Sequence, residues 1–258
     1  MPSEKYAFLH ESAIIEYHNV LFAAWYNNRK NELQGETHIR FSLSYDQGKT
    51  WSEPKTLVND ESGSILYCPP VFGICDDRLY LLLNQMVAPD HIHSLDLYVY
   101  NENNKVFERL WSRPIPFKLN TNVYTLPNGK LILSGRVGNL DGFPKTPAVL
   151  ISDSGKIDAD WRLVKIQQDG RLADGSEFLH PEVSLVINKD IIYAFCRNDA
   201  RRVPIIYMSH DFGESWSGPF SHDIPFHASK IYSGTLSDGR NYVIGNLEPD
   251  RKKLAIFF

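Results

Sequence analysis

The chain of 258 residues lacks most of the features that identify common classes of enzyme and binding protein. Its three cysteines, Cys68, Cys75 and Cys196, are odd in number and have no paired C-x-x-C spacing, which argues against a disulfide framework and a structural zinc site. We expect all three to be buried apolar residues. Gly-rich phosphate loops, HExxH and GxSxG elements are also absent, which excludes the common nucleotide-binding, zinc-protease and α/β-hydrolase classes. No metal or cofactor is expected.

An excess of basic residues is also absent. Lys and Arg number 27 against 31 Asp and Glu, a net charge of -4, so no overall positive field attracts nucleic acid or an anionic membrane. No run approaches the roughly 20 apolar residues of a membrane span, and the first residues do not resemble a signal peptide. We therefore expect a cytoplasmic protein that binds neither nucleic acid nor membrane. The sequence does not determine the oligomeric state.

Helical periodicity is scarce as well. No segment keeps apolar residues at a helical spacing for three turns without a Gly, a Pro or a turn cluster. Instead, β-branched and aromatic runs alternate with tight polar turns, which is typical of β-hairpins. Five such hairpins are expected, at residues 12–25, 71–83, 123–133, 183–195 and 231–244. The chain is therefore predicted to be almost entirely β-strand.

Two segments nearly repeat each other, Ser44–Trp51 and Ser209–Trp216, and both follow the pattern S-x-D-x-G-x-(T/S)-W. In such a turn the Asp side chain accepts hydrogen bonds from backbone N–H groups, the Gly supplies a positive φ, and the Trp packs on a neighbouring strand. Degenerate copies begin at residues 101 and 152, so the turn recurs every 51 to 57 residues. Four strands in a repeat of this length are typical of a β-propeller blade.

The repeats follow one another without a linker rich in Pro, Gly or Ser. Because all-β chains of this length often form one domain, residues 1–258 are expected to be a single propeller domain. Five inner hairpins fit into the sequence, and the next turn of the series would fall just after Phe258, where an expected strand stops. We expect about five blades and a truncation before the last one.

The boxes and their spacing resemble the bacterial neuraminidase repeat, or Asp-box, of the sialidase superfamily, whose members are mostly six-bladed propellers. The resemblance covers nearly the whole chain. It implies an all-β propeller of the sialidase type and a glycoside hydrolase acting on a terminal acidic sugar of a glycan at the mouth of the channel. Asp-boxes also occur in proteins that are not sialidases. Two alternatives therefore stay open: a non-catalytic glycan-binding propeller, and a lyase or hydrolase of uronate-containing glycans whose base is His180 or His38.

Polar residues that interrupt apolar inner hairpins, such as Asn84, are expected at the channel mouth. Among them, Glu182 and Arg197 stand on either side of one hairpin, which returns the chain beside itself, so a carboxylate and a guanidinium are expected to meet. The resemblance implies that Glu182 orients or activates the nucleophile and that Arg197 binds a substrate carboxylate. His180 is a candidate substrate contact. A structural ion pair between blades is the alternative for Glu182 and Arg197.

Three further residues complete the predicted site. Arg251 stands where the sialidase pattern has its next arginine, which implies that Arg197 and Arg251 grip the carboxylate together, although Arg251 also lies in a run of charged residues. Arg136 is a candidate third guanidinium, which would favour a uronic or ulosonic acid. For the acid/base that the family carries before its first Asp-box, Glu36 is the leading candidate.

Two parts of the sialidase pattern have no counterpart. The family's first arginine stands in its first inner strand, where this sequence has Glu11–Ile15. The family's nucleophilic tyrosine follows the third arginine, and no tyrosine in this sequence can be assigned to that role.

Overall fold

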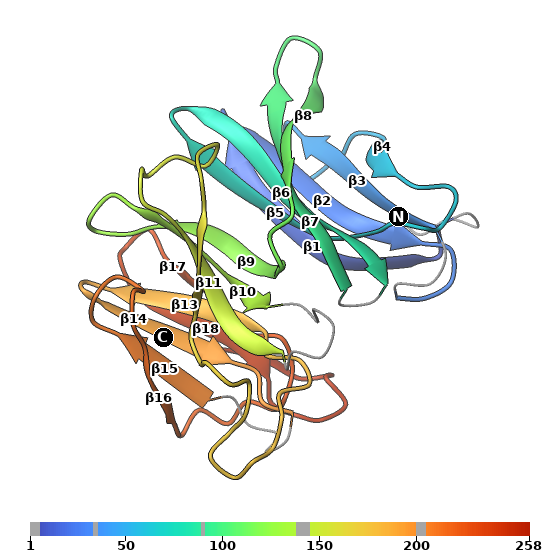
Figure 1. Ribbon diagram of the computed structural model, residues 1–258. Helices are drawn as coiled ribbons and strands as arrows, with labels where there is room; N and C mark the ends of the chain where they lie inside the picture. The colour runs from blue at the N-terminus through green and yellow to red at the C-terminus, as the bar shows by residue number, and fades with distance from the viewer. Residues whose placement is uncertain (1–5, 33–35, 89–90, 138–144, 200–204) are drawn as a thin grey trace. The chain divides into compact units, whose positions relative to one another are not determined.

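The computed structural model describes residues 6–32, 36–88, 91–137, 145–199 and 205–258. Over these ranges the regular structure consists of 19 strands joined by turns and loops (Figure 1). Among the described residues there is no helix of the length and hydropathy that crossing a membrane requires. The prediction of an almost entirely β chain is confirmed.

Residues 1–119 make up one compact unit, which contains two antiparallel sheets of four strands. The first consists of β1 (Phe8–Tyr17), β2 (Val20–Asn28), β3 (Thr37–Ser44) and β4 (Lys55–Asn59). The second consists of β5 (Leu66–Cys75), β6 (Arg78–Ala88), β7 (His91–Asn101) and β8 (Val106–Arg113).

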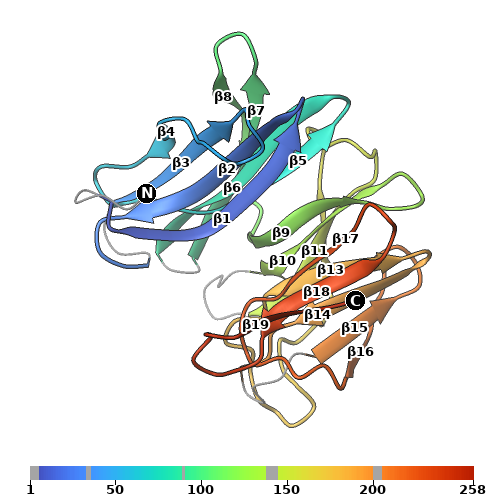
Figure 2. The ribbon, with the colours of Figure 1, turned by 180° about the vertical axis from the view of Figure 1, so that it is seen from behind.

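Residues 120–258 make up the second unit, with three sheets. Their strands are β9 (Phe117–Thr125), β10 (Leu131–Val137), β11 (Thr146–Ser152) and β12 (Arg162–Lys165); β13 (Val183–Asn188), β14 (Ile191–Cys196), β15 (Ile205–Ser209) and β16 (Ser217–Phe220); and β17 (Tyr232–Thr235), β18 (Asn241–Asn246) and β19 (Leu254–Phe257). Within the second unit β17 runs beside β13 (Figure 2).

In every sheet each strand pairs with the next one along the chain, which is the meander of a propeller blade. The five predicted hairpins are the connections between the first two strands of the five sheets. All of them are confirmed. The alternation of apolar and polar residues along these strands places one set of side chains against the neighbouring sheet.

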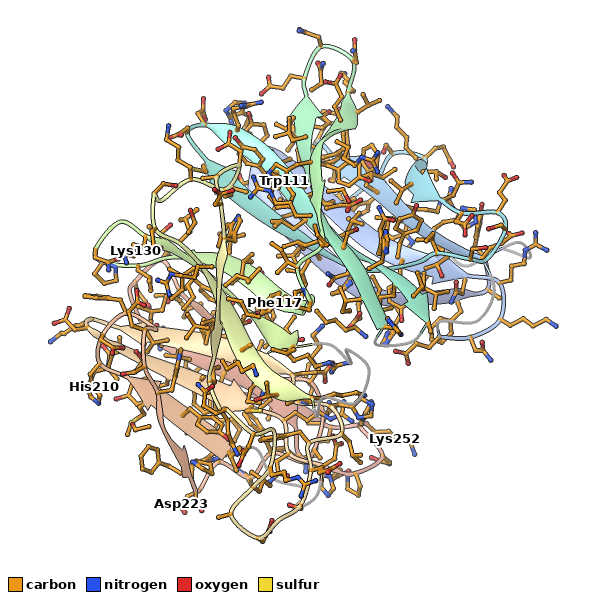
Figure 3. All side chains as sticks on the ribbon, in the orientation of Figure 1. Trp111, Phe117, Lys130, His210, Asp223 and Lys252 are labelled. Carbon is orange, nitrogen blue, oxygen red and sulfur yellow. The ribbon has the colours of Figure 1, made fainter. Side chains whose placement is uncertain are left out.

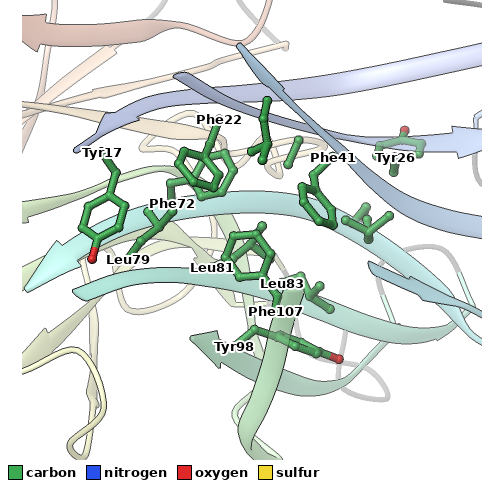
Figure 4. Close-up of a cluster of buried hydrophobic side chains, with 14 of the residues drawn as sticks. Tyr17, Phe22, Tyr26, Phe41, Phe72, Leu79, Leu81, Leu83, Tyr98 and Phe107 are labelled. Atoms are coloured by element: carbon green, nitrogen blue, oxygen red, sulfur yellow. The ribbon is translucent and has the colours of Figure 1, made fainter. Parts of the chain in front are cut away.

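The core of the first unit lies between its two sheets (Figure 4). Phe22 and Phe41 come from the first sheet, and both approach Phe107 edge-on, with ring centroids 6.4 and 5.3 Å away. Leu81 and Leu83 from β6 are fully buried in the same cluster. Burial of each such side chain contributes about 1.5–3 kcal/mol, so apolar packing holds these two blades together.

The two complete Asp-boxes connect the third and fourth strands of their sheets. Asp46 accepts a hydrogen bond from the Thr50 backbone N–H at 2.8 Å and another from its hydroxyl at 2.6 Å. Ser44 donates to Asp46 at 2.9 Å and accepts from the Gly48 N–H at 2.8 Å. Gly48 has φ +87°, as the turn requires. The boxes therefore brace the turns, as predicted.

Two predictions about single residues differ from the structure. Cys68 and Cys196 are buried as expected, but Cys75 is only half-buried because it ends β5 next to an exposed turn. Asn84 is fully buried rather than at a channel mouth. Its amide donates to the Phe117 carbonyl and accepts from the Leu119 N–H, both at 2.8 Å, so it satisfies backbone groups at the start of β9.

Candidate functional site

A largely buried cluster of charged side chains in the second unit surrounds the open end of the β13–β14 hairpin. Val183 pairs with Cys196 in the ladder, and one step further the Arg197 N–H donates to the Glu182 carbonyl at 2.9 Å. This register puts the two side chains at the same end of the sheet. The expected contact between them is present.

Two carboxylates of the chain bind the guanidinium of Arg197. Its Nη1 donates to Glu182 Oε2 at 3.0 Å, while its Nε and Nη2 donate to Asp199 Oδ1 at 3.0 and 2.8 Å. The three side chains are only 13 to 16% exposed. Charge-assisted hydrogen bonds that are shielded from solvent are stronger than those at a surface. They therefore fix the orientation of all three groups.

Asp199 also contacts His180, whose Nδ1 lies 3.4 Å from the second carboxylate oxygen. Burial by itself raises the pKa of Asp199, but the interactions with His180 and Arg197 outweigh it and lower the pKa to about 2. The His180 side chain is 46% exposed. Asp199 therefore holds an exposed imidazole on one side and a largely buried guanidinium on the other.

Sequence reasoning missed Asp199. The signal was present, because an acidic residue two positions after Arg197 in an extended segment points to the same side of the backbone.

Arg136 contributes charge close to this cluster. It lies on β10, is 2% exposed, and interacts electrostatically with the thiol of Cys196, the last residue of β14. Burial raises the pKa of the Cys196 thiol well above its usual range, the Glu182 charge adds to this, and the Arg136 charge opposes it. Positive and negative side chains from two neighbouring blades thus both act on the thiol of Cys196.

Arg251 lies in the exposed turn between β18 and β19, with a left-handed φ of 58° and its N–H bonded to the Glu248 carbonyl at 3.1 Å. Its neighbour Lys252 projects from this turn (Figure 3) and pairs with Asp250 at 3.1 Å. Within the described ranges, no ion pair or side-chain hydrogen bond joins Arg251 to another residue. Its role in binding a carboxylate stays a prediction.

Glu36 belongs to the first unit, just before β3. Arg29 donates to both of its carboxylate oxygens at 3.1 Å, and Nε2 of the buried His38 lies 3.8 Å from Oε2. The Tyr6 ring packs edge-on against His38 at 5.0 Å. The two hydrogen bonds from Arg29 orient the Glu36 carboxylate. The part of Glu36 in proton transfer stays a prediction. Across the part of the chain that the structure describes, no group of three or more His, Cys, Asp or Glu side chains is arranged to hold a metal ion.

The model of the BNR repeat-like domain family matches residues 19–258. The chain belongs to this family. The match includes every strand from β2 to β19 and the whole Glu182–Arg197–Asp199 cluster. No curated protein sequence matches it.

Solved sialidases have a similar fold. The Hadza microbial sialidase Hz136 superimposes with a TM-score of 0.71 at 11% identity, over 93% of this chain and 53% of the other. A Trypanosoma rangeli sialidase in complex with sialic acid gives 0.69 at 12% identity, over 96% and 46%. The phage phi92 endosialidase gives 0.62 at 14% identity, over 90% and 49%. The BNR repeat protein thus has the blades of a sialidase-type β-propeller and spans about half the length of these proteins.

Proposed function

We propose that this BNR repeat protein is a glycoside hydrolase that acts on a terminal acidic sugar at the cluster formed by Glu182, Arg197 and Asp199. The observation that carries the proposal is the 3.0 Å contact between Arg197 and Glu182, two largely buried charged groups at the open end of one hairpin. Ion pairs buried to this degree cost desolvation energy, and they concentrate at functional sites. The similarity to a sialidase that was solved in complex with sialic acid supports a carbohydrate as the partner.

Each residue has a chemical task in this proposal. The Glu182 carboxylate, held by Arg197, accepts the proton of the attacking nucleophile. Arg197 donates three hydrogen bonds to Glu182 and Asp199, and a guanidinium has further N–H donors, which would bind the carboxylate of the sugar. Arg251 adds a second guanidinium to that carboxylate.

The remaining predicted residues act around this centre. The buried Arg136 adds positive charge beside Cys196, which favours an acidic sugar. The half-exposed His180 contacts the bound sugar.

Release of the fluorescent group from 4-methylumbelliferyl sialic acid tests the proposal. We expect Glu182→Gln and Arg197→Ala each to lower the rate by at least about a hundredfold, the contribution typical of one positioned catalytic group. Arg240→Ala is the matched control, because its guanidinium is 61% exposed and its contacts, with Asp238 and the Phe258 ring, lie outside the proposed site. A wild-type rate of zero, or variants as active as the control, would contradict the proposal.

The contact of His180 with Asp199 supports a second candidate, a lyase of uronate-containing glycans. A carboxylate next to Nδ1 leaves Nε2 of the half-exposed ring available as a base. This reaction would produce an unsaturated uronate, which absorbs in the ultraviolet, and His180→Ala would abolish the increase in absorbance.

Glycan binding without turnover in either assay would indicate the third possibility, a non-catalytic glycan-binding propeller.

A further inference from the structure

The first unit contains a small pocket that no part of the proposed function uses. It lies where the β1–β2 turn meets the turns that follow β3 and β7, and its volume is about 140 Å³. Val20, Phe22 and Leu43 supply apolar side chains to its lining. All of these elements belong to the same compact unit.

Two tyrosines present ring surface in this pocket. Tyr45 is the second residue of the first Asp-box and is 61% exposed. Its neighbours Ser44 and Asp46 are bonded to each other at 2.9 Å within the turn, so the box itself directs Tyr45 outward. Tyr100 is half-buried and packs edge-on against Phe22, with ring centroids 4.8 Å apart. One aromatic surface is therefore fixed by the core and the other is available to a ligand.

The polar lining carries the carboxylate of Glu102, the ammonium of Lys105 and the imidazole of His18. Glu102 Oε1 accepts a hydrogen bond from the Tyr17 hydroxyl at 2.6 Å and lies 3.3 Å from Nδ1 of His18, so its carboxylate is held in place. The Lys105 ammonium lies 5.9 Å from the centroid of the Tyr45 ring. An acceptor and a donor thus stand beside the exposed aromatic ring.

We propose that this pocket, which we call the Tyr45 pocket, binds one neutral pyranose ring of a glycan. Its volume of about 140 Å³ is small, so it can receive one face of a single ring and not an extended chain. The C–H face of the sugar packs on Tyr45 and Tyr100, and its hydroxyls bond to Glu102 and Lys105. Because Glu102, Lys105 and His18 bring groups of both charge signs to the lining, a neutral sugar fits it better than an acidic or a basic one.

Saturation-transfer NMR on the full chain, with methyl β-galactopyranoside and methyl α-mannopyranoside as probes, tests the Tyr45 pocket. We expect saturation of the ring C–H protons of at least one probe, with a Kd on the order of 1 mM because a single open ring is contacted. Tyr45→Ala should weaken binding by about tenfold or more, and Lys105→Ala by a few fold. Both side chains are exposed at this surface, so the fold should persist.

Two controls separate this site from the site of the proposed function. Phe220→Ala removes another exposed aromatic ring, 41% exposed and located in the second unit, and should leave binding unchanged. Glu182→Gln should also leave it unchanged, whether or not the protein has hydrolase activity. The absence of saturation transfer to either probe in the wild type overturns the proposal. So does binding that Tyr45→Ala leaves intact, or that only Glu182→Gln removes.

Discussion

Asp199 determines the orientation of the Arg197 guanidinium. A guanidinium that faced only Glu182 would rotate about its long side chain, but two hydrogen bonds from Nε and Nη2 to Asp199 fix its plane. The same carboxylate contacts His180 with its other oxygen. A single side chain thus orients a cation that would bind substrate and an imidazole that would exchange protons.

Replacement of this carboxylate tests its contribution to stability. The pKa of Asp199 is about 2 in the folded protein and 3.8 for a free aspartate, so its interactions stabilise the fold above about pH 4 and are lost as the pH falls toward 2. The contribution is on the order of 2 kcal/mol. Asp199→Asn should remove this part of the pH dependence of the free energy of unfolding, measured with urea between about pH 2 and 6. An unchanged profile relative to the exposed control Asp174→Asn would contradict the assigned contacts.

His18 gives the opposite pH dependence. Its Nε2 lies 2.9 Å from Asp77 and its Nδ1 lies 3.3 Å from Glu102, and the hydrogen bond to Asp77 raises its pKa. Both nitrogens can donate only when the ring is protonated. The stabilisation is therefore complete below the unfolded pKa of about 6.5 and disappears as the pH rises through the folded value.

We expect His18→Gln to lower the melting temperature at about pH 6 and to have a smaller effect at about pH 9. His210→Gln is the control, since this residue lies in the exposed turn that follows β15 (Figure 3). A loss of stability that is equal at both pH values would contradict a role for the charged ring.

Among the structural elements, the Asp-box is a local turn that also packs against a neighbouring blade. In the fourth sheet, Gly213 has φ +90°, and a Cβ there would lie 3.0 Å from Ile132 and 3.3 Å from Ile151 of the third sheet. The turn of one blade thus packs closely on the next blade. Lys130 and Arg162 of the third sheet reach the same turn and pair with Glu214 at 3.2 and 2.8 Å.

Two glycine substitutions separate the effect of the positive φ at Gly213 from the effect of its close packing on the neighbouring blade. Gly239 has φ +86° and open space around it, so Gly239→Ala introduces backbone strain alone, about 1 kcal/mol. Gly213→Ala introduces the same strain together with the contact on Ile132 and Ile151, and should cost about 1–3 kcal/mol more. Equal losses in urea unfolding would mean that the blades do not pack as described.

Much of the arrangement of strands and turns was predictable from the sequence. The boxes at Ser44–Trp51 and Ser209–Trp216 and all five hairpins follow from turn residues and alternating apolar residues, because each depends on neighbours along the chain. The meeting of Glu182 and Arg197 was predictable for the same reason, since one hairpin joins them. The burial of Asn84 was not predictable from the sequence, because the backbone groups that it binds, at Phe117 and Leu119, belong to a strand of another sheet.

At the scale of the whole molecule, the chain consists of two compact units, residues 1–119 and 120–258. The expectation of a single domain predicts that they unfold together. Strand β9 supports this, because it begins at Phe117 in the first unit and forms the first strand of a sheet in the second. Asn84 holds its first residues in place.

Core substitutions in each unit test this prediction. Leu81 and Leu185 are fully buried in the clusters of the first and second unit, and Leu81→Ala or Leu185→Ala should cost about 2–5 kcal/mol. We expect both variants to shift one common calorimetric transition. Two transitions, of which each variant shifts a different one, would mean that the units are independent domains.

Local patterns in the sequence were enough to predict the strands, the turns, the succession of blades along the chain and the contact of Glu182 with Arg197. These depend on propensity, periodicity and one short loop, all of which are local in the chain. The folded structure was needed to show that Asp199 shares Arg197 with Glu182, that Asn84 is buried, and that Tyr45 and Tyr100 line one pocket. Such features depend on side-chain direction and on strands brought together from distant positions, which no local pattern specifies.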